Sequence, residues 1–362
     1  MLRKKGTSLG VDIGSSSIKA VEMEYDSKGP SILNAGISEP LEDDSFGSAS
    51  VALAELVGRK KFRTKRTVAT VKVTTEGSAT ARRIFMEHVT PNIKKSELKE
   101  RVEWEAITRD YIPFPAEEAV MDCHVLGEGT RDNIPGLYVF FVAVRKDLVK
   151  ERVDMLKSAG LIPIAIEIDF SAILGLLSYA DLFPDDEDIV VIDIGATKTS
   201  VGIVYRGQLA FYRDLSIAGD HVTSQIERRL RVKKQEAEDY KFTEDLFERI
   251  SDGTGEIWHA ASPIEPVIEE RQGLYPQIRE CFRYYEGDVP NAELSKVYFS
   301  GGASQLNNLD NFLSQRLAIP VENVHFLDYI PVADDADLSE IEGKEPVFAT
   351  AVGLSLKPYR KK

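Results

Sequence analysis

The feature of this sequence that most constrains its fold is a short pattern that occurs in two distant parts of the chain. An apolar run leads into Asp-Ile-Gly, then small and hydroxyl residues, then a second apolar run, at residues 9–22 and again at 190–204. Each copy predicts a strand–turn–strand hairpin whose tip presents backbone N–H groups and hydroxyls to an anion. Because Gly and Ser are common in turns, one copy alone would fit an ordinary β-hairpin equally well. The two copies together predict two related domains whose hairpin tips face a shared phosphate.

Composition narrows the class of protein further. With 362 residues the chain exceeds one ordinary core, so we expect two domains. Its net charge of −14 comes with no large basic face for nucleic acid, and no apolar run is long enough to span a bilayer. The N-terminus carries no signal-peptide core, and Cys123 and Cys281 form neither a metal-spaced cluster nor a disulfide framework. We therefore expect a cytoplasmic protein.

A third motif lies towards the C-terminus, where a strand predicted at 295–300 runs into Gly301 and Gly302 and then into a helix. Without side chains, the double glycine lets the backbone lie flat against a ring or sugar, and the helix N-terminus that follows favours an anion. An ordinary loop between a strand and a helix fits the same residues. The motif therefore points to a nucleotide only in combination with the two hairpins.

The character of the sequence changes near residue 81. Pro113 and Pro115 end a helix that begins near residue 96, and Gly160 is placed to cap a later helix. We therefore predict a small α+β subdomain at 81–160. Its predicted elements are a strand at 82–86, the helix from 96, strands at 119–126 and 137–144 around a turn at 127–136, and a helix at 146–158.

These elements predict an α/β protein of three parts. Residues 1–80 form the first domain with the first hairpin, residues 81–160 are its insert, and residues 161–362 form the second domain. Within the second domain we expect a charged helical lobe at about 235–290. A helix of small residues at 348–356 is predicted to return to the first domain.

In this order, the two hairpins and the strand–Gly-Gly–helix turn resemble the actin-like ATPase superfamily, which includes Hsp70, sugar kinases and the division protein FtsA. The resemblance covers nearly the whole chain and implies an actin-like fold of two related domains, each with a mixed sheet flanked by helices, that binds ATP or ADP. It implies that Asp12 and Asp193 lie near Mg²⁺, directly or through water. The residues it places along the phosphates are Gly14, Ser15, Ser16, Ser17, Gly195, Ala196, Thr197 and Thr199, and those along the adenosine are Gly301, Gly302 and Ser304.

The same resemblance implies further nucleotide contacts. Lys19 matches a lysine often found after the first phosphate loop, although an exposed strand lysine fits equally well. Gly219 and Asp220 resemble a segment that lies near the ribose and α-phosphate. Glu238 and Lys241 resemble a pair that clasps the nucleoside, and their i, i+3 spacing puts them on one helix face, where a solvated ion pair is the alternative.

Within the superfamily, the opening motif and part of the insert resemble the PilM family, the cytoplasmic actin-like component of type IV pilus assembly. The matching insert segments are Val102-Glu103-Trp104-Glu105-Ala106 and residues 111–118. This resemblance implies an ATP-binding scaffold that is recruited to the inner membrane because it binds the short cytoplasmic N-terminal segment of the membrane protein PilN. It also implies contacts with other pilus components and motors. Trp104 and its aromatic neighbours are equally explained as core residues of the insert.

The catalytic residue is the least defined part of the site. Glu167, at the end of a predicted strand that feeds a helix, is the candidate for orienting the attacking water, or else a structural residue at a strand end. We therefore expect nucleotide binding with slow hydrolysis at most. Two other functions stay open: an FtsA-like filament-forming protein and a small-molecule kinase, and a homo-oligomer is compatible with each. No sugar-binding cluster of Asp, Asn and His is evident.

Overall fold

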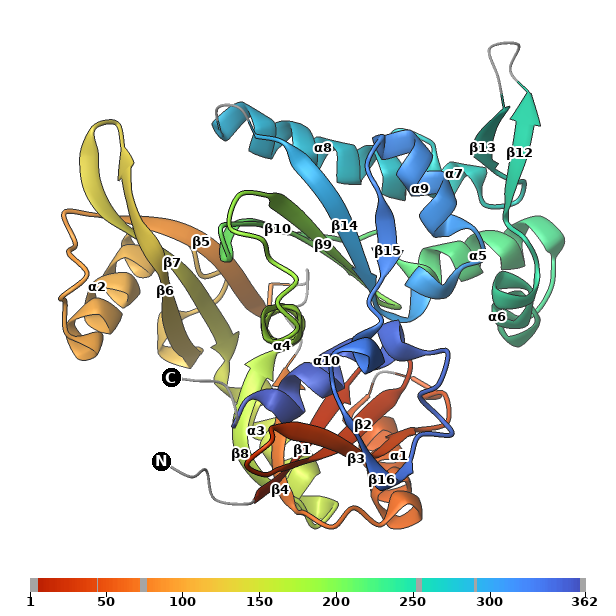
Figure 1. Ribbon diagram of the computed structural model, residues 1–362, viewed down its shortest axis with the longest axis horizontal. Helices are drawn as coiled ribbons and strands as arrows, with labels where there is room; N and C mark the ends of the chain where they lie inside the picture. The colour runs from red at the N-terminus through yellow and green to blue at the C-terminus, as the bar shows by residue number, and fades with distance from the viewer. Residues whose placement is uncertain (1–5, 44, 72–76, 252–255, 290–291, 359–362) are drawn as a thin grey trace.

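Each predicted hairpin lies at the centre of its own β-sheet (Figure 1). The computed structural model describes residues 6–43, 45–71, 77–251, 256–289 and 292–358. Strands of the six-stranded sheet follow the order β16-β3-β2-β1-β4-β8, and those of the five-stranded sheet the order β11-β10-β9-β14-β15. The first sheet consists of β1 (Gly6–Ile13), β2 (Ile18–Tyr25), β3 (Pro30–Ile37), β4 (Arg66–Val71), β8 (Ile162–Ile168) and β16 (Val332–Asp337). The second consists of β9 (Asp188–Ile194), β10 (Thr199–Tyr205), β11 (Gln208–Leu215), β14 (Leu294–Ser300) and β15 (Val321–Asn323).

The two sheets repeat one arrangement of strands. β1 is antiparallel to β2 and parallel to β4, while β2 is antiparallel to β3. In the second sheet β9 is likewise antiparallel to β10 and parallel to β14, and β10 is antiparallel to β11. The last pairs of the two hairpins are Ile13 with Ile18 and Ile194 with Thr199, so each tip is a four-residue turn. The predicted fold, two related halves with mixed sheets, is confirmed.

The insert forms a third sheet, in the order β5-β7-β6. Its elements are β5 (Ala79–Glu87), α2 (Lys95–Thr108), the short η1 (Ala116–Glu118), β6 (Ala119–Arg131) and β7 (Ile134–Arg145). Helix α2 covers one face of this sheet, because Leu98, Val102 and Ala106 pack into a core shared with Ile84 and Phe141. The apolar residues of the insert therefore build a small core of their own.

The structure departs from the predicted boundaries of the insert. The turn predicted at 127–136 is mostly strand, because Asp132 and Asn133 adopt the left-handed backbone of a two-residue hairpin turn. Helix α3 (Lys146–Ser158) packs Met155 and Leu156 into the core beside β1, and β8 pairs with β4. Both elements therefore belong with the first sheet, so that sheet continues past the predicted break at residue 160.

The region at about 235–290, predicted to be a helical lobe, also contains strands. Its elements are α6 (Lys234–Thr243), β12 (Phe247–Ser251), β13 (Glu256–Ala260), α7 (Glu265–Ile268) and α8 (Leu274–Asp288). β12 and β13 form an antiparallel pair, which places Phe247 in the core while the next residue, Glu248, is exposed. The prediction of a helical lobe, interrupted near residues 253–255, is therefore wrong at the two strands that flank this interruption, while α6, α7 and α8 are helical as predicted.

Two helices lie between the sheets, at the centre of the molecule (Figure 1). They are α4 (Asp169–Tyr179) and α10 (Glu345–Leu356); the remaining elements are α1 (Phe46–Lys60), α5 (Gly219–Leu230), η2 (Gly302–Gln305), α9 (Leu309–Leu317) and η3 (Phe326–Asp328). Helix α10 packs against β1, β2 and α4, so the C-terminal helix does lie on the first sheet. Within the described ranges, no helix combines the length and hydrophobicity needed to cross a membrane.

Two glycines set how closely α10 approaches its neighbours. A Cβ at Gly353 of α10 would lie 2.0 Å from the carbonyl oxygen of Ala172 in α4. A Cβ at Gly10 of β1 would lie 2.1 Å from the carbonyl oxygen of Ala351 in α10. Both distances are far below van der Waals contact, so any side chain here would push α10 away from its neighbours.

We predict that Gly353→Ala lowers the free energy of unfolding by about 1–3 kcal/mol, because an added methyl group overpacks this contact. Urea denaturation would measure the change. Gly58→Ala is the matched control, since Gly58 also lies in a helix but a Cβ there has nothing within 4 Å. Alanine at position 58 should raise the free energy of unfolding by about 0.5–1 kcal/mol. Equal effects at the two positions would contradict the prediction.

Candidate functional site

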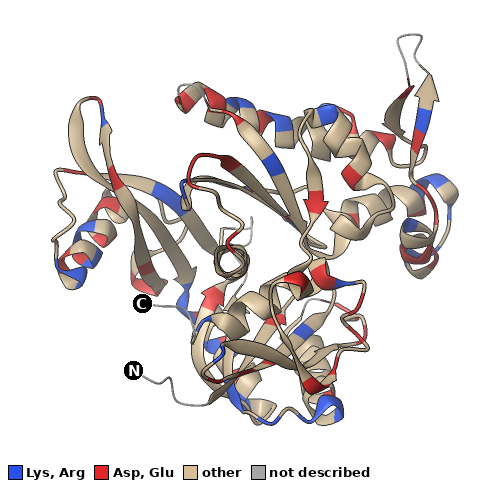
Figure 2. Cartoon of the chain, viewed as in Figure 1, with Lys and Arg blue, Asp and Glu red and all other residues tan. Residues whose placement is uncertain are grey.

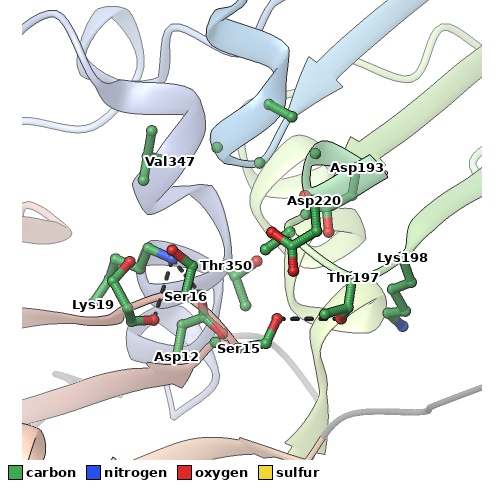
Figure 3. A pocket seen from close by; sticks show the side chains of 18 of the residues that line it. Asp12, Ser15, Ser16, Lys19, Asp193, Thr197, Lys198, Asp220, Val347 and Thr350 are labelled. Atoms are coloured by element: carbon green, nitrogen blue, oxygen red, sulfur yellow. Dashed lines mark hydrogen bonds and ion pairs between the residues drawn. The ribbon is translucent and has the colours of Figure 1, made fainter. Parts of the chain in front are cut away.

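The tips of the two hairpins face each other across a cavity of about 140 Å³ (Figure 3). Ser15 Oγ of the first tip and Thr197 Oγ1 of the second lie 3.2 Å apart, within hydrogen-bond distance. The predicted nucleotide residues that line the cavity are Asp12, Gly14, Ser15, Ser16, Ser17, Lys19, Asp193, Gly195, Ala196, Thr197, Gly219, Asp220, Glu238, Lys241, Gly301 and Gly302. Motifs that are far apart in the sequence therefore meet at one site.

Asp12 is held at the end of β1 by two neighbours. Thr70 Oγ1 donates to Asp12 Oδ1 over 3.3 Å, and Lys19 Nζ lies 3.8 Å from Asp12 Oδ2. Lys19 lines the cavity with only 12% of its side chain exposed, so it is not an exposed strand lysine. Gly14 has no room for a side chain, since a Cβ would lie 2.6 Å from Ser17 O. The first hairpin thus forms one wall of the cavity and offers a carboxylate, an ammonium group and a backbone free of side chains at Gly14.

Asp193 occupies the equivalent position at the end of β9. Its Oδ1 accepts a hydrogen bond from Ser300 Oγ over 2.9 Å. The next loop requires glycine at 301, because the φ angle of Gly301 is 88° and a Cβ would lie 2.4 Å from Ile194 O. Burial, together with the negative charge of Asp169, raises the pKa of Asp193 to about 6. The second wall therefore holds a carboxylate whose charged form is disfavoured by burial.

The acidic cavity suits a divalent cation that binds together with phosphate. Asp12, Asp169 and Asp193 all line it, and the first two raise the pKa of the third. Across the described part of the chain, no group of three His, Cys, Asp or Glu side chains is arranged to hold a metal ion by itself. Mg²⁺ in proteins is usually held by one or two carboxylates, with waters and substrate phosphates as the other ligands. Asp12 and Asp193 fit that arrangement.

A buried ion-paired cluster in the cavity wall was not predicted from the sequence. Lys198, at the second hairpin tip, lies 3.1 Å from Asp169 Oδ2 and 3.5 Å from Asp214 Oδ1. Asp214 also accepts hydrogen bonds from Ser200 Oγ over 2.6 Å and from Tyr212 OH over 2.8 Å. Burial acts to lower the pKa of Lys198, but the charges of the two aspartates outweigh it and raise that pKa. The sequence held one signal for this cluster, because Lys198 lies within the second copy of the repeated motif.

The predicted nucleoside pair forms another wall of the cavity. Lys241 Nζ lies 2.8 Å from Glu238 Oε2 and donates to Thr223 Oγ1 over 2.8 Å. Lys241 is only 4% exposed, so the solvated ion pair that the sequence also allowed is excluded. Phe242, Ala303, Val347 and Thr350 line the cavity as well, and the sequence motifs did not include them.

Thr199 and Ser304 were predicted to contact the nucleotide, but neither lines the cavity. Thr199 Oγ1 donates to Ile217 O over 2.7 Å, and Ser304 Oγ donates to Gly301 O over 2.8 Å. Both hydroxyls are used inside the protein, where they stabilise the loops that surround the cavity. Their predicted contacts are corrected accordingly.

Glu167 does not lie at the cavity either. Its carboxylate accepts a hydrogen bond from Ser171 Oγ over 2.7 Å and pairs with Lys357 Nζ at 2.6 Å. Because Glu167 is still in β8, its side chain points to the end of α10, whereas Asp169 begins α4 and lines the cavity. The assignment of Glu167 as the water-orienting residue is therefore wrong, and the alternative role at the strand end holds.

Comparison with known proteins adds to this geometry. A family model described as type IV pilus assembly protein PilM matches residues 10–359. The chain belongs to the PilM family. A chain of the PilM–PilN type IV pilus biogenesis complex is 24% identical, with a TM-score of 0.78, and the match covers 98% of this chain and 99% of that one. The ethanolamine utilization protein EutJ from Carboxydothermus hydrogenoformans is 13% identical, with a TM-score of 0.50 and coverage of 98% and 90%.

PilM membership confirms the family resemblance seen in the opening motif and in the insert. At these identities the two solved structures show the fold, which is that of the actin-like ATPases. MreB5 of Spiroplasma citri, solved with bound AMPPNP, is a weaker match: it is 13% identical, with a TM-score of 0.49 and coverage of 97% and 95%. The PilM-family chain combines an actin-like fold with a cavity between its two hairpins.

We predict that Asp193 makes the stability of the unliganded protein depend on pH. Its pKa is about 6 when folded against an ordinary value of 3.8, so between these pH values the folded state holds the proton more tightly. The contribution of Asp193 to stability is therefore present below pH 3.8 and is lost as the pH rises through 6. Relative to the wild type, Asp193→Asn should gain about 3 kcal/mol in free energy of unfolding between acidic and neutral pH.

Urea denaturation without nucleotide or divalent cations would measure this gain over the pH range. Asp185→Asn is the control, because Asp185 is an exposed residue of a turn. Its effect on the free energy of unfolding should be the same at every pH. A pH-independent difference between wild type and Asp193→Asn would show that the pKa of Asp193 is not raised.

Proposed function

We propose that this PilM-family chain is an ATP-binding scaffold of type IV pilus assembly. The observation that carries the proposal is the cavity between two equivalent hairpins, lined by Asp12 and Asp193 from opposite sides and by Glu238 with the buried Lys241. A ligand held there must be anionic at one part and must offer polar groups to a buried ammonium at another. ATP or ADP with Mg²⁺ has this combination.

In this proposal each wall binds a different part of the nucleotide. Backbone N–H groups and hydroxyls of the tips at 14–17 and 195–197 bind the phosphates, as such turns bind anions in other proteins. Asp12 and Asp193 hold Mg²⁺, directly or through water, and Lys19 adds positive charge beside the phosphates. Gly301 and Gly302 lie along the adenosine.

We further propose that hydrolysis is slow or absent. A fast hydrolase needs a group that orients the attacking water in line with the phosphate. Glu167 is turned away and paired with Lys357, and the carboxylate of Asp169 is paired with Lys198. A carboxylate that is already neutralised by an ammonium group is a poor proton acceptor at neutral pH. The nucleotide would then act mainly by joining the two halves of the protein.

The partner we propose is the N-terminal cytoplasmic segment of a PilN-like inner-membrane protein. The relative with the TM-score of 0.78 is described as part of a PilM–PilN complex, which supports this choice. By binding such a segment, the chain would be held at the inner face of the membrane. Other pilus components and the motors would be reached through the same assembly.

We predict that Asp12→Ala abolishes ATP binding measured by calorimetry, because it removes a cation ligand and leaves Lys19 without its carboxylate. The expected loss is about 2–5 kcal/mol of binding free energy. Capture of a synthetic PilN N-terminal peptide should also weaken in this variant. Asp186→Ala, a change of the same kind at an exposed turn, should leave both affinities unchanged. Unchanged ATP affinity in a folded Asp12→Ala protein would remove the first hairpin from the site.

Two further measurements separate the scaffold from its alternatives. Rapid turnover of Mg-ATP with a sugar or acyl acceptor would establish a kinase instead. Long ATP-dependent polymers in sedimentation, formed without any partner, would establish a filament-forming protein of the FtsA kind.

A further inference from the structure

The insert carries two contiguous grooves on the flank of α2, along the outer edge of β5. Their volumes are about 260 and 250 Å³. The grooves share four lining residues, which are Phe85, Glu87, Glu105 and Arg109. None of the residues that line these grooves lines the nucleotide cavity. The grooves are therefore a separate feature of the molecule, to which the proposed function assigns no role.

β5 is an edge strand of the insert sheet. It pairs with β7 from Ala79–Val144 to Glu87–Gly136, and among the described strands none pairs with its other side. An open edge presents backbone N–H and C=O groups that an extended peptide can use as an added strand. The two grooves lie where the side chains of such a strand would reach.

One groove is rich in arginine. Arg82, Arg83, Arg109 and Arg131 line it, together with Glu87, Glu105 and Asp132. Arg109 pairs with Glu105, but in the described part of the chain no carboxylate lies within ion-pair distance of the other three guanidinium groups. Figure 2 shows the basic band on β5 beside a molecule whose net charge is −14. The groove is thus a local cationic site on an acidic protein.

Aromatic rings hold two of these arginines in place. The guanidinium carbon of Arg82 lies 4.9 Å from the ring centroid of Tyr111, and that of Arg83 lies 3.6 Å from the ring centroid of Tyr138. A stacked guanidinium loses less freedom when it binds, and its planar donors match a carboxylate. Carboxylates are therefore the groups that this groove fits.

The other groove is mainly apolar and is bordered by Trp104. Phe85, Met86 and Val89 line it, and Trp104 on α2 is 65% exposed. The core of the insert is built from the opposite face of α2, so Trp104 is not needed there, contrary to the simplest explanation of its sequence position. Exposed Trp and Arg side chains beside a groove are the residues that most often contribute binding energy at protein interfaces.

We propose that the β5 edge docks an extended, acidic segment of a partner protein. The segment pairs with β5 as a fourth strand, its carboxylates bind Arg82, Arg83 and Arg131, and an apolar side chain packs beside Trp104. The partner is specified by charge complementarity and by the open edge. Charged edge strands also protect sheets against aggregation, but that role requires neither grooves nor stacked arginines.

The probe is a short capped peptide in which Asp alternates with Val, compared with a peptide in which Lys replaces Asp. The chain has two tryptophans, so in a Trp258→Phe background the fluorescence reports Trp104 alone. We expect a saturable change with the acidic peptide that weakens as NaCl rises, and none with the basic peptide. Alternate N–H groups of the bound peptide would point toward β5. N-methylation of these nitrogens should weaken binding, because it removes the backbone donors.

The variant Arg82→Glu/Arg131→Glu should weaken binding of the acidic peptide at least about tenfold, because it replaces attraction with repulsion. Arg271→Glu/Arg279→Glu makes the same change of charge away from the insert and should leave the affinity unchanged. Equal affinity in the two double variants, with both proteins folded, would overturn the proposal. The proposal would also be overturned if the chain without peptide associated with itself and Arg82→Glu/Arg131→Glu abolished that association. The β5 edge would then bind a second copy of the chain.

The Asp12→Ala variant distinguishes this proposal from the proposed function. It should lose ATP binding and keep full affinity for the acidic peptide. Loss of both would show that the peptide binds at the nucleotide cavity, which would overturn the docking surface. If Asp12→Ala kept ATP binding while the peptide still bound at β5, the nucleotide assignment would fail and the docking surface would stand.

Discussion

The geometry of the cavity depends on the close contact that α10 makes with β1 on one side and α4 on the other. Gly10 and Gly353 permit this approach, because neither position has room for a side chain. Asp12 follows Gly10 by two residues on β1, and Asp169 is the first residue of α4. Val347 and Thr350 of α10 itself line the cavity. Tight packing of one helix thus places the carboxylates and one wall of the site at the same time.

Much of the fold and site could be predicted because the decisive signals are local and repeated. Each hairpin folds from neighbouring residues, so Asp12 and Asp193 could be placed at equivalent tips from the sequence alone. The predictions failed for two different reasons. The partner of β8 is distant in sequence, because β8 joins β4 across the whole insert, whereas β12 and β13 are neighbouring strands whose charged sequence was predicted to be helical. Glu167 was misplaced for a related reason, since its partner is Lys357 at the other end of the chain.

Charge favours a ligand that brings a cation to the cavity. Asp193 is buried, and this burial, with the negative charges of Asp169 and Asp12, raises its pKa. Lys198 is the nearest buried cation, but it is shared between Asp169 and Asp214. In the proposed function, a nucleotide would bring a divalent cation, which would supply positive charge beside Asp193. Such a ligand would also contact both hairpins, so it would neutralise this charge and bridge the two halves at the same time.

The two faces of the insert sheet have different neighbours within the protein. On one face, Phe140 packs edge-to-face on Tyr212 with ring centroids 5.6 Å apart, and Tyr212 donates to Asp214, which lies beside Lys198 of the cavity wall. That face is therefore connected to the cavity wall through packed and hydrogen-bonded groups. The groove beside Trp104 lies on the flank of α2, which covers the opposite face. A partner docked at the β5 edge, as proposed above, is therefore expected to bind whether or not a ligand occupies the cavity.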